Sequence, residues 1–243
     1  MGLMIEQGGA FDEYEAVALL PGPELASGAL GTAVFLRRSA RPSRRAVLHL
    51  HDLTDSFAPA DLARWYNERG FHFYMTDLDV REPLEAGARR RPTPSARDSF
   101  AALDSACAHM RRADGIDAII LSAQEDAAPA AALWCHARRS ANPVDALILS
   151  NPRFGKQPRR SLDIACPVLV ISGSDDSAGD GRTDRRGRRG RESIRLGQHV
   201  TWLYIDNETT GQADKAAGRR RIFDEMGRWL GAYMYGQVRD QLL

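Results

Sequence analysis

Short apolar runs alternate with segments of helical spacing along most of the chain. Apolar runs of about four to eight residues bounded by turn residues are typical of buried strands. The expected strands are residues 14–20, 31–38, 46–51, 71–78, 118–122, 144–150, 167–172 and 200–205. The expected helices are residues 60–69, 98–112, 130–139 and 219–235. This alternation predicts an α/β fold with a doubly wound, mostly parallel sheet.

The chain is expected to form one domain over residues 1–243, because its length and 43% hydrophobic content suffice for one large core. Pro21-Gly22-Pro23 separates the first two strands and favours an antiparallel pair there. Two stretches interrupt the alternation. Residues 82–96 are rich in Arg and Pro, and residues 174–192 carry six arginines, at 182, 185, 186, 188, 189 and 191, among glycines. Both are predicted to be mobile surface loops.

The charges are nearly balanced, with a net charge of +1 and a sequence pI of about 7.8. This balance gives no reason to expect binding to nucleic acid or anionic lipid. The arginine-rich loop could still form a phosphate-binding patch, but it has no aromatic residue to stack on bases, which favours a solvated loop. The apolar runs are shorter than the ~20 residues of a membrane span, and residues 1–6 do not resemble a leader. We therefore expect a cytoplasmic protein.

The three cysteines, Cys107, Cys135 and Cys166, lie in apolar or helical settings. Their number is odd and their spacing does not match a metal site, so we interpret them as reduced core residues. No cofactor or metal is expected from the sequence.

Residues 118–139 have the order of a nucleophile elbow, in which a strand and a tight turn lead into a helix. The G-x-S-x-G pattern of such an elbow is absent. Aligned with it, Gln124 takes the place of the serine, and Ser122 and Asp126 take the places of the two glycines. Pro129 fits best in the first turn of the helix, so Asp126 is a candidate N-cap.

Four ordered segments resemble those of α/β-hydrolases, in particular the serine aminopeptidase and monoacylglycerol-lipase-like branch. They are residues 47–55, 63–79, 144–152 and 166–173, and the resemblance extends from about residue 14 to 235. It implies an α/β-hydrolase fold. Only residues 152–163 separate the two strands between which the family inserts a helical lid, so we expect no cap domain.

The resemblance places a degenerate catalytic triad on this chain. The nucleophile position falls on Gln124, the acid position on Asp176 and the histidine position on Thr210. A glutamine amide is not a nucleophile, and loss of the nucleophile from such a triad lowers kcat by about 10⁶-fold. Ester or amide hydrolysis by the usual triad chemistry should therefore be negligible.

The resemblance also implies a polar pocket at the carboxyl ends of the strands. His51 takes the position of the oxyanion-loop histidine and Asp52 that of a glycine, and the amides of Leu53 and Glu125 are the implied oxyanion donors. The pocket would be lined by acidic and amide side chains: Asp52, Asp55, Gln124, Glu125, Asp126, Asp176 and Glu208. Such a pocket suits a cationic ligand, a metal or basic side chains of a partner, and it disfavours fatty acyl chains.

Several candidate residues also have a structural interpretation. Ser122 could be a displaced nucleophile, but its place near the strand end favours a structural serine, and His136 should point away from the site. Asp176 could be a remnant of the triad or an ordinary turn residue, and the turn role is favoured. His49 and His51 lie on one strand face, where structural hydrogen bonding is favoured over acid/base catalysis.

Two functions remain open. The favoured hypothesis is a catalytically degenerate α/β-hydrolase-like protein that binds an unidentified small molecule or protein. The alternative is an enzyme of this fold, lyase-like, cyclase-like or with residual hydrolase activity, that uses Gln124, Asp176, His51 and Asp52 as polar groups. Nucleic acid and membrane are not expected partners, and homo-oligomerisation stays open.

Overall fold

The computed structural model describes residues 15–18, 33–37, 39, 41–51, 59–77, 96–125, 127–152, 154, 160–173, 194–196, 199–205 and 212–235. The chain divides into two compact units, Met1–Leu121 and Ser122–Leu243, and β5 (Ala118–Gln124) runs through the division. The single domain expected from composition stays a prediction. The predicted loops lie outside the described residues, apart from Ala96.

The first unit is built on strands in the order β1-β2-β4-β3-β5. β1 (Glu15–Ala18) pairs antiparallel with β2 (Ala33–Arg37), which confirms the predicted opening pair. β2 is antiparallel to β4 (His72–Asp77), and β4 is parallel to β3 (Arg45–His51). The apolar run of β3 is fully buried from Ala46 to Leu48, as expected of a strand inside a parallel sheet.

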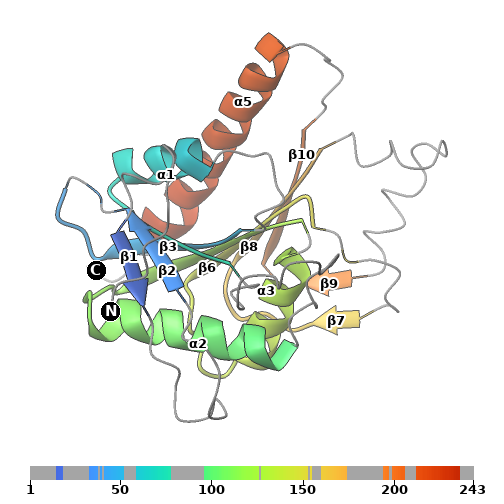
Figure 1. Ribbon diagram of the computed structural model, residues 1–243. Coiled ribbons are helices and arrows are strands. Elements are labelled where there is room, and N and C mark those ends of the chain that lie inside the picture. Colours follow the sequence, from blue (N-terminus) through green and yellow to red (C-terminus); the bar gives the residue numbers. More distant parts are fainter. Residues whose placement is uncertain are drawn as a thin grey trace, which may run out of the picture. The chain divides into compact units, whose positions relative to one another are not determined.

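Two helices cover opposite sides of the strands of the first unit (Figure 1). In α1 (Pro59–Glu68) proline takes the first helical position, where its missing N–H costs nothing, and Gly70 ends the helix with φ +77°. In α2 (Ala96–Arg112) Leu103, Cys107 and Met110 recur at helical spacing and are buried. Each helix therefore presents one apolar stripe to the core.

In the second unit the strand order is β5-β6-β8-β10, and β6, β8 and β10 are parallel. β6 (Ala146–Ser150), β8 (Val168–Gly173) and β10 (Val200–Ile205) are paired in register, with Leu147 opposite Val168 and Val200 opposite Val168. The short strands β7 (Arg160–Leu162) and β9 (Ile194–Leu196) form a separate parallel pair. The sequence did not predict these two strands.

The helices of the second unit are α3 (Ala127–Ala137) and α5 (Gln212–Leu230), which continues as the π-helical turn η2 (Gly231–Tyr235). They lie on opposite sides of the strands β6, β8 and β10 (Figure 1). On α5 the indole N–H of Trp229 donates to the hydroxyl of Thr201 on β10, at 3.1 Å. Among the described residues, no helix has the length and apolar character needed to cross a bilayer.

All three cysteines are unpaired thiols in buried positions. This confirms the interpretation of the cysteines as reduced core residues. Burial raises the pKa of the Cys107 thiol to about 12, since an apolar surrounding disfavours the thiolate, and Asp104 adds to the rise while Arg111 opposes it.

We predict that Cys107 resists alkylation in the folded protein. A rise from 9.0 to about 12 lowers its thiolate fraction at pH 8 about a thousandfold, and the thiolate is the form that reacts. Iodoacetamide labelling read out by peptide mass spectrometry should therefore modify Cys107 only as fast as the chain unfolds, whereas the urea-unfolded chain should react at once. Rapid labelling of the native protein at Cys107 would contradict the buried position.

Candidate functional site

β5 extends two residues beyond the predicted strand and ends at Gln124. Ser122 and Ala123 are buried, with Ser122 only 3% exposed, and they continue the strand because both side chains are small enough for the interior. Gln124 is half-buried. The turn that follows the strand therefore comes one residue later than a turn centred on Gln124.

Glu125 is the turn residue. Its φ of 44° lies in the left-handed region, which costs a residue with a Cβ about 1–2 kcal/mol. Two hydrogen bonds hold this conformation: the Glu125 amide donates to the Ser150 carbonyl at 2.9 Å, and the Glu125 carbonyl accepts from the Ala128 amide at 3.3 Å. In this structure the Glu125 amide bonds to Ser150 within the fold, and the expectation that it serves as an oxyanion donor stays a prediction.

The helix after the turn begins at Ala127, three residues earlier than predicted. Pro129 lies in its first turn, where proline is tolerated, as the sequence indicated. The residues two positions before and after Glu125 are Ala123 and Ala127, and both are buried. Small side chains on both sides are what a sharp strand-to-helix turn requires, and this spacing is a signal in the sequence that points to Glu125 rather than Gln124.

The neighbouring strand ends in the same way. Asn151 follows β6 with φ 44°, and its amide donates to the carbonyl of Ile171 on β8 at 2.7 Å. Ser150, Asn151 and Ser172 are half-buried at the ends of β6 and β8. Because parallel strands present their carboxyl ends at one edge, these groups join Glu125 at the carboxyl edge of the second unit. Sequence reasoning did not single out Ser150, Asn151 or Ser172.

The comparisons with solved structures identify this architecture. A dienelactone hydrolase from Anabaena variabilis matches with a TM-score of 0.66 at 13% identity, covering 91% of this chain and 99% of the other. The chain has the α/β-hydrolase fold. Est1E from Butyrivibrio proteoclasticus matches with a TM-score of 0.58 at 11% identity, covering 89% and 99% of the two chains. No family model and no curated protein matches the sequence.

An α/β serine hydrolase without a lid, from Xanthomonas campestris, also matches, with a TM-score of 0.52, 16% identity and coverage of 94% and 95%. In this α/β-hydrolase-fold chain, the connection between β6 and β8 is residues 151–167. Its described residues include the three residues of β7 and no helix. The structure thus confirms the expected fold without a cap domain.

The remaining predicted site residues are only partly described. His51 is the last residue of β3, opposite Asp77 of β4, and its side chain lies outside the description. The other seven positions lie outside the described residues: Asp52, Leu53, Asp55, Asp126, Asp176, Glu208 and Thr210. Their assigned roles stay predictions. Among the described residues, no group of three or more His, Cys, Asp or Glu side chains could hold a metal ion.

Three polar residues weighed from the sequence have structural surroundings. Ser122 is buried within β5, and His49 is 2% exposed with its ring 5.6 Å from that of Phe73. The imidazole Nδ1 of His136 accepts from the Asp163 amide at 2.9 Å, which fixes the end of α3 beside the end of β7. These positions support the structural interpretation of all three.

We predict opposite responses to glycine at the two elbow residues. Glycine relieves a left-handed conformation but weakens a strand. Glu125→Gly should therefore be more stable than Glu125→Ala by about 1 kcal/mol, whereas Gln124→Gly should be less stable than Gln124→Ala by about 0.5–1 kcal/mol. Urea denaturation of the four variants measures both differences. The reverse ranking at position 125 would show that Glu125 is not the turn residue.

Proposed function

We propose that this α/β-hydrolase-fold protein is a binding module without serine-hydrolase chemistry, and that it holds a small molecule or a protein segment at the carboxyl edge of its sheet. The fold is established by the solved structures that it matches, and those at 11–16% identity carry no information about substrate. The proposal therefore depends on the residues of this chain.

The observation that carries the proposal is the left-handed Glu125 at the turn between β5 and α3. We propose that it occupies the position of the nucleophile, in place of Gln124, because it is the residue held at positive φ between Ala123 and Ala127. With either assignment the side chain is a carboxylate or an amide. An amide is not a nucleophile, and a carboxylate that attacked an ester would give a mixed anhydride rather than the ester or thioester acyl-enzyme of a serine or cysteine hydrolase.

Ser122 does not replace the missing hydroxyl. It is 3% exposed inside a strand, so a substrate carbonyl could reach it only if the elements packed over its side chain moved away. Catalysis by a serine requires its oxygen within about 3 Å of the reacting carbon. The burial of Ser122 therefore supports the conclusion that it does not act as a displaced nucleophile.

The polar character of the edge indicates the chemistry of the ligand. Gln124, Glu125, Asn151 and Ser172 are half-buried, so each retains access to solvent while part of its side chain is fixed. Pockets for acyl chains are lined mainly by apolar side chains, whereas an edge with a carboxylate and two amides suits a ligand rich in hydrogen-bond donors. We therefore favour a cationic or strongly polar group as the part of the ligand that contacts Glu125.

We predict that the purified chain is not labelled by a fluorophosphonate probe and does not hydrolyse p-nitrophenyl acetate above the buffer rate. Glu125→Ser should remain unlabelled as well, because a serine without a base stays protonated at neutral pH. An active serine hydrolase in the same tube serves as the control for the probe. Stoichiometric labelling of the wild-type chain, mapped to any serine, would contradict the proposal.

We predict further that native mass spectrometry of the purified full chain detects a bound species whose occupancy depends on Glu125. Glu125→Gln should lower the occupancy at least tenfold, since a carboxylate–cation hydrogen bond is stronger than an amide one. Glu225→Gln, on α5, removes one carboxylate elsewhere in the same unit and should leave occupancy unchanged. Equal occupancy in the wild type, Glu125→Gln and Glu225→Gln would show that Glu125 is not part of the binding site.

A further inference from the structure

His72, the first residue of β4, bonds to both ends of the connection between β2 and β3. Its Nδ1 accepts from the Ser39 amide at 2.9 Å, and its Nε2 lies 3.1 Å from the Ser43 carbonyl. A backbone amide can only donate, so Nδ1 carries no hydrogen, and a carbonyl can only accept, so Nε2 carries one. The two bonds together therefore specify a neutral imidazole with its hydrogen on Nε2.

The hydroxyl groups of the same two serines tie the connection to the end of α1. The Ser39 hydroxyl donates to the Asn67 carbonyl at 3.2 Å, and Ser39 is only 9% exposed. The Ser43 hydroxyl donates to the Gly70 carbonyl. Because these contacts hold both serines against the end of the helix, the Ser39 amide stays directed at the imidazole of His72.

Protonation of His72 would break one of its two bonds and keep the other. The proton from solvent adds to Nδ1, which then places an N–H group against the N–H of Ser39. Nε2 keeps its hydrogen and its bond to Ser43. His72 is half-buried, so a proton can reach the ring without unfolding of the chain. The connection would therefore detach at Ser39 and stay bound at Ser43.

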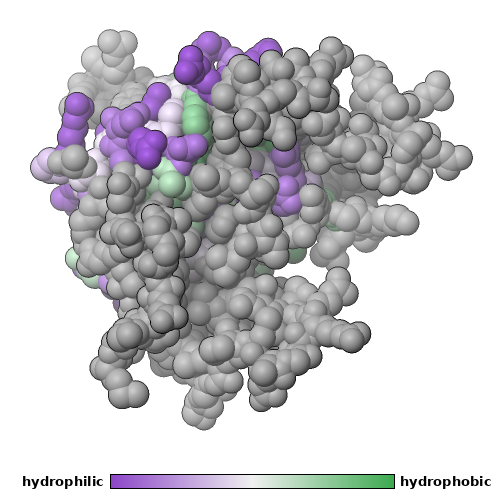
Figure 2. Space-filling view, turned by 45° about the horizontal axis from the view of Figure 1, so that its top comes forward, coloured by the Kyte–Doolittle hydropathy of each residue, from purple (hydrophilic) through white to green (hydrophobic). Residues whose placement is uncertain are grey.

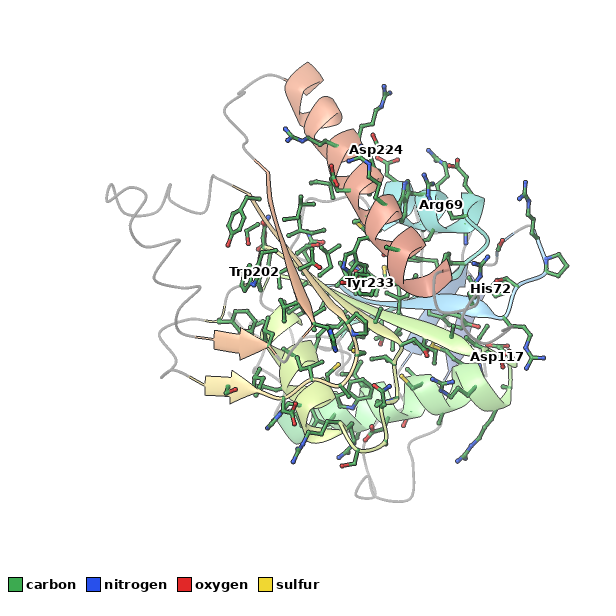
Figure 3. All side chains as sticks on the ribbon, turned by 180° about the vertical axis from the view of Figure 1, so that it is seen from behind. Arg69, His72, Asp117, Trp202, Asp224 and Tyr233 are labelled. Atoms are coloured by element: carbon green, nitrogen blue, oxygen red, sulfur yellow. The ribbon has the colours of Figure 1, made fainter. Side chains whose placement is uncertain are left out.

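Charged residues surround His72 at one edge of the first unit. Arg69, His72 and Asp117 lie at this edge (Figure 3), and hydrophilic residues make up much of the described surface on the side that Figure 2 presents. Basic residues outnumber acidic ones in the described part of the neighbouring elements, and a surplus of positive charge disfavours a further proton. The basic residues are Arg37, Arg41, Arg44, Arg45, Arg69, His109, Arg111 and Arg112, and the acidic ones are Glu68, Asp114 and Asp117.

The acidic residues act on His72 less directly than Ser39 does. Asp117 pairs with Arg44 at 2.6 Å, and Asp114 accepts from the hydroxyl of Tyr74 at 2.7 Å. Glu68 is exposed at the last position of α1, where solvent and salt screen its charge. Both ring nitrogens of His72 already bond to backbone groups, so a carboxylate would have to displace one of these groups to reach the ring. The bond to Ser39 therefore decides which form the fold favours.

We propose that His72 is a pH-sensitive latch, which holds the start of the β2–β3 connection while it is neutral and releases Ser39 when it is protonated. A bond made only by the neutral form of a histidine is complete above the ordinary pKa of about 6.5 and is lost as the pH falls below it. The latch is built from residues of the first unit alone. It does not depend on the ligand proposed for Glu125.

Amide hydrogen exchange of the full-length chain, followed by NMR at about pH 7.5 and about pH 5, tests the latch. The exchange rate of each amide is expressed as protection relative to an unstructured peptide at the same pH. Protection of the Ser39 amide should fall at least tenfold at the lower pH. The Asp117 amide, which donates to the Arg44 carbonyl at 2.8 Å without a histidine, is the internal control and should change less than twofold.

Two substitutions of His72 separate its two bonds. In His72→Asn the side-chain oxygen can take the place of Nδ1 and does not titrate, so Ser39 should be protected at both pH values. In His72→Gln the side-chain amide can take the place of Nε2 and leaves Ser39 without its acceptor, so protection should be low at both. His199→Gln changes an exposed histidine of the second unit and should keep the response of the wild type.

The ¹⁵N shifts of the imidazole in the wild-type chain give a second measurement that needs no substitution. They should show the hydrogen of His72 on Nε2 at about pH 7.5. The thermal midpoint of each variant establishes that it is folded, and the wild-type measurements decide for any variant that is not. A hydrogen on Nδ1, equal protection of Ser39 at both pH values in the wild type, or a wild-type response in folded His72→Asn overturns the proposal.

Discussion

The candidate site depends on one backbone hydrogen bond, from the Glu125 amide to the Ser150 carbonyl. It extends the pairing of β5 with β6 by one residue beyond the strand and so fixes where the chain turns towards α3. Loss of this partner would cost about 1–3 kcal/mol, which is similar to the strain of about 1–2 kcal/mol in the left-handed conformation, so the hydrogen bond offsets that strain. The pairing therefore decides that a glutamate, rather than the glutamine before it, stands at the turn.

A hydrogen bond of the same kind follows the next strand, where the Asn151 amide donates to the carbonyl of Ile171 on β8. Asparagine adopts the left-handed region more readily than most residues, so its presence there is explained by the backbone alone. Glutamate has no such preference. A glycine at position 125 would satisfy the turn at lower cost, so the presence of a charged side chain at this strained position is consistent with the binding role proposed for it.

Most of the fold could be predicted from the sequence because each buried strand of the main sheet corresponds to a short apolar run in the sequence. The errors arose where tertiary contacts decide the structure. β5 extends beyond the predicted strand through Ala123 and Gln124 because Ala123 is small enough to be buried in the interior, and this shifts the turn one residue past its predicted place. The strands β7 and β9 are three residues each and pair with each other across more than thirty residues of chain, which no local pattern reveals. α5 begins at Gln212 rather than 219 because its first residues are polar or small and show no apolar period.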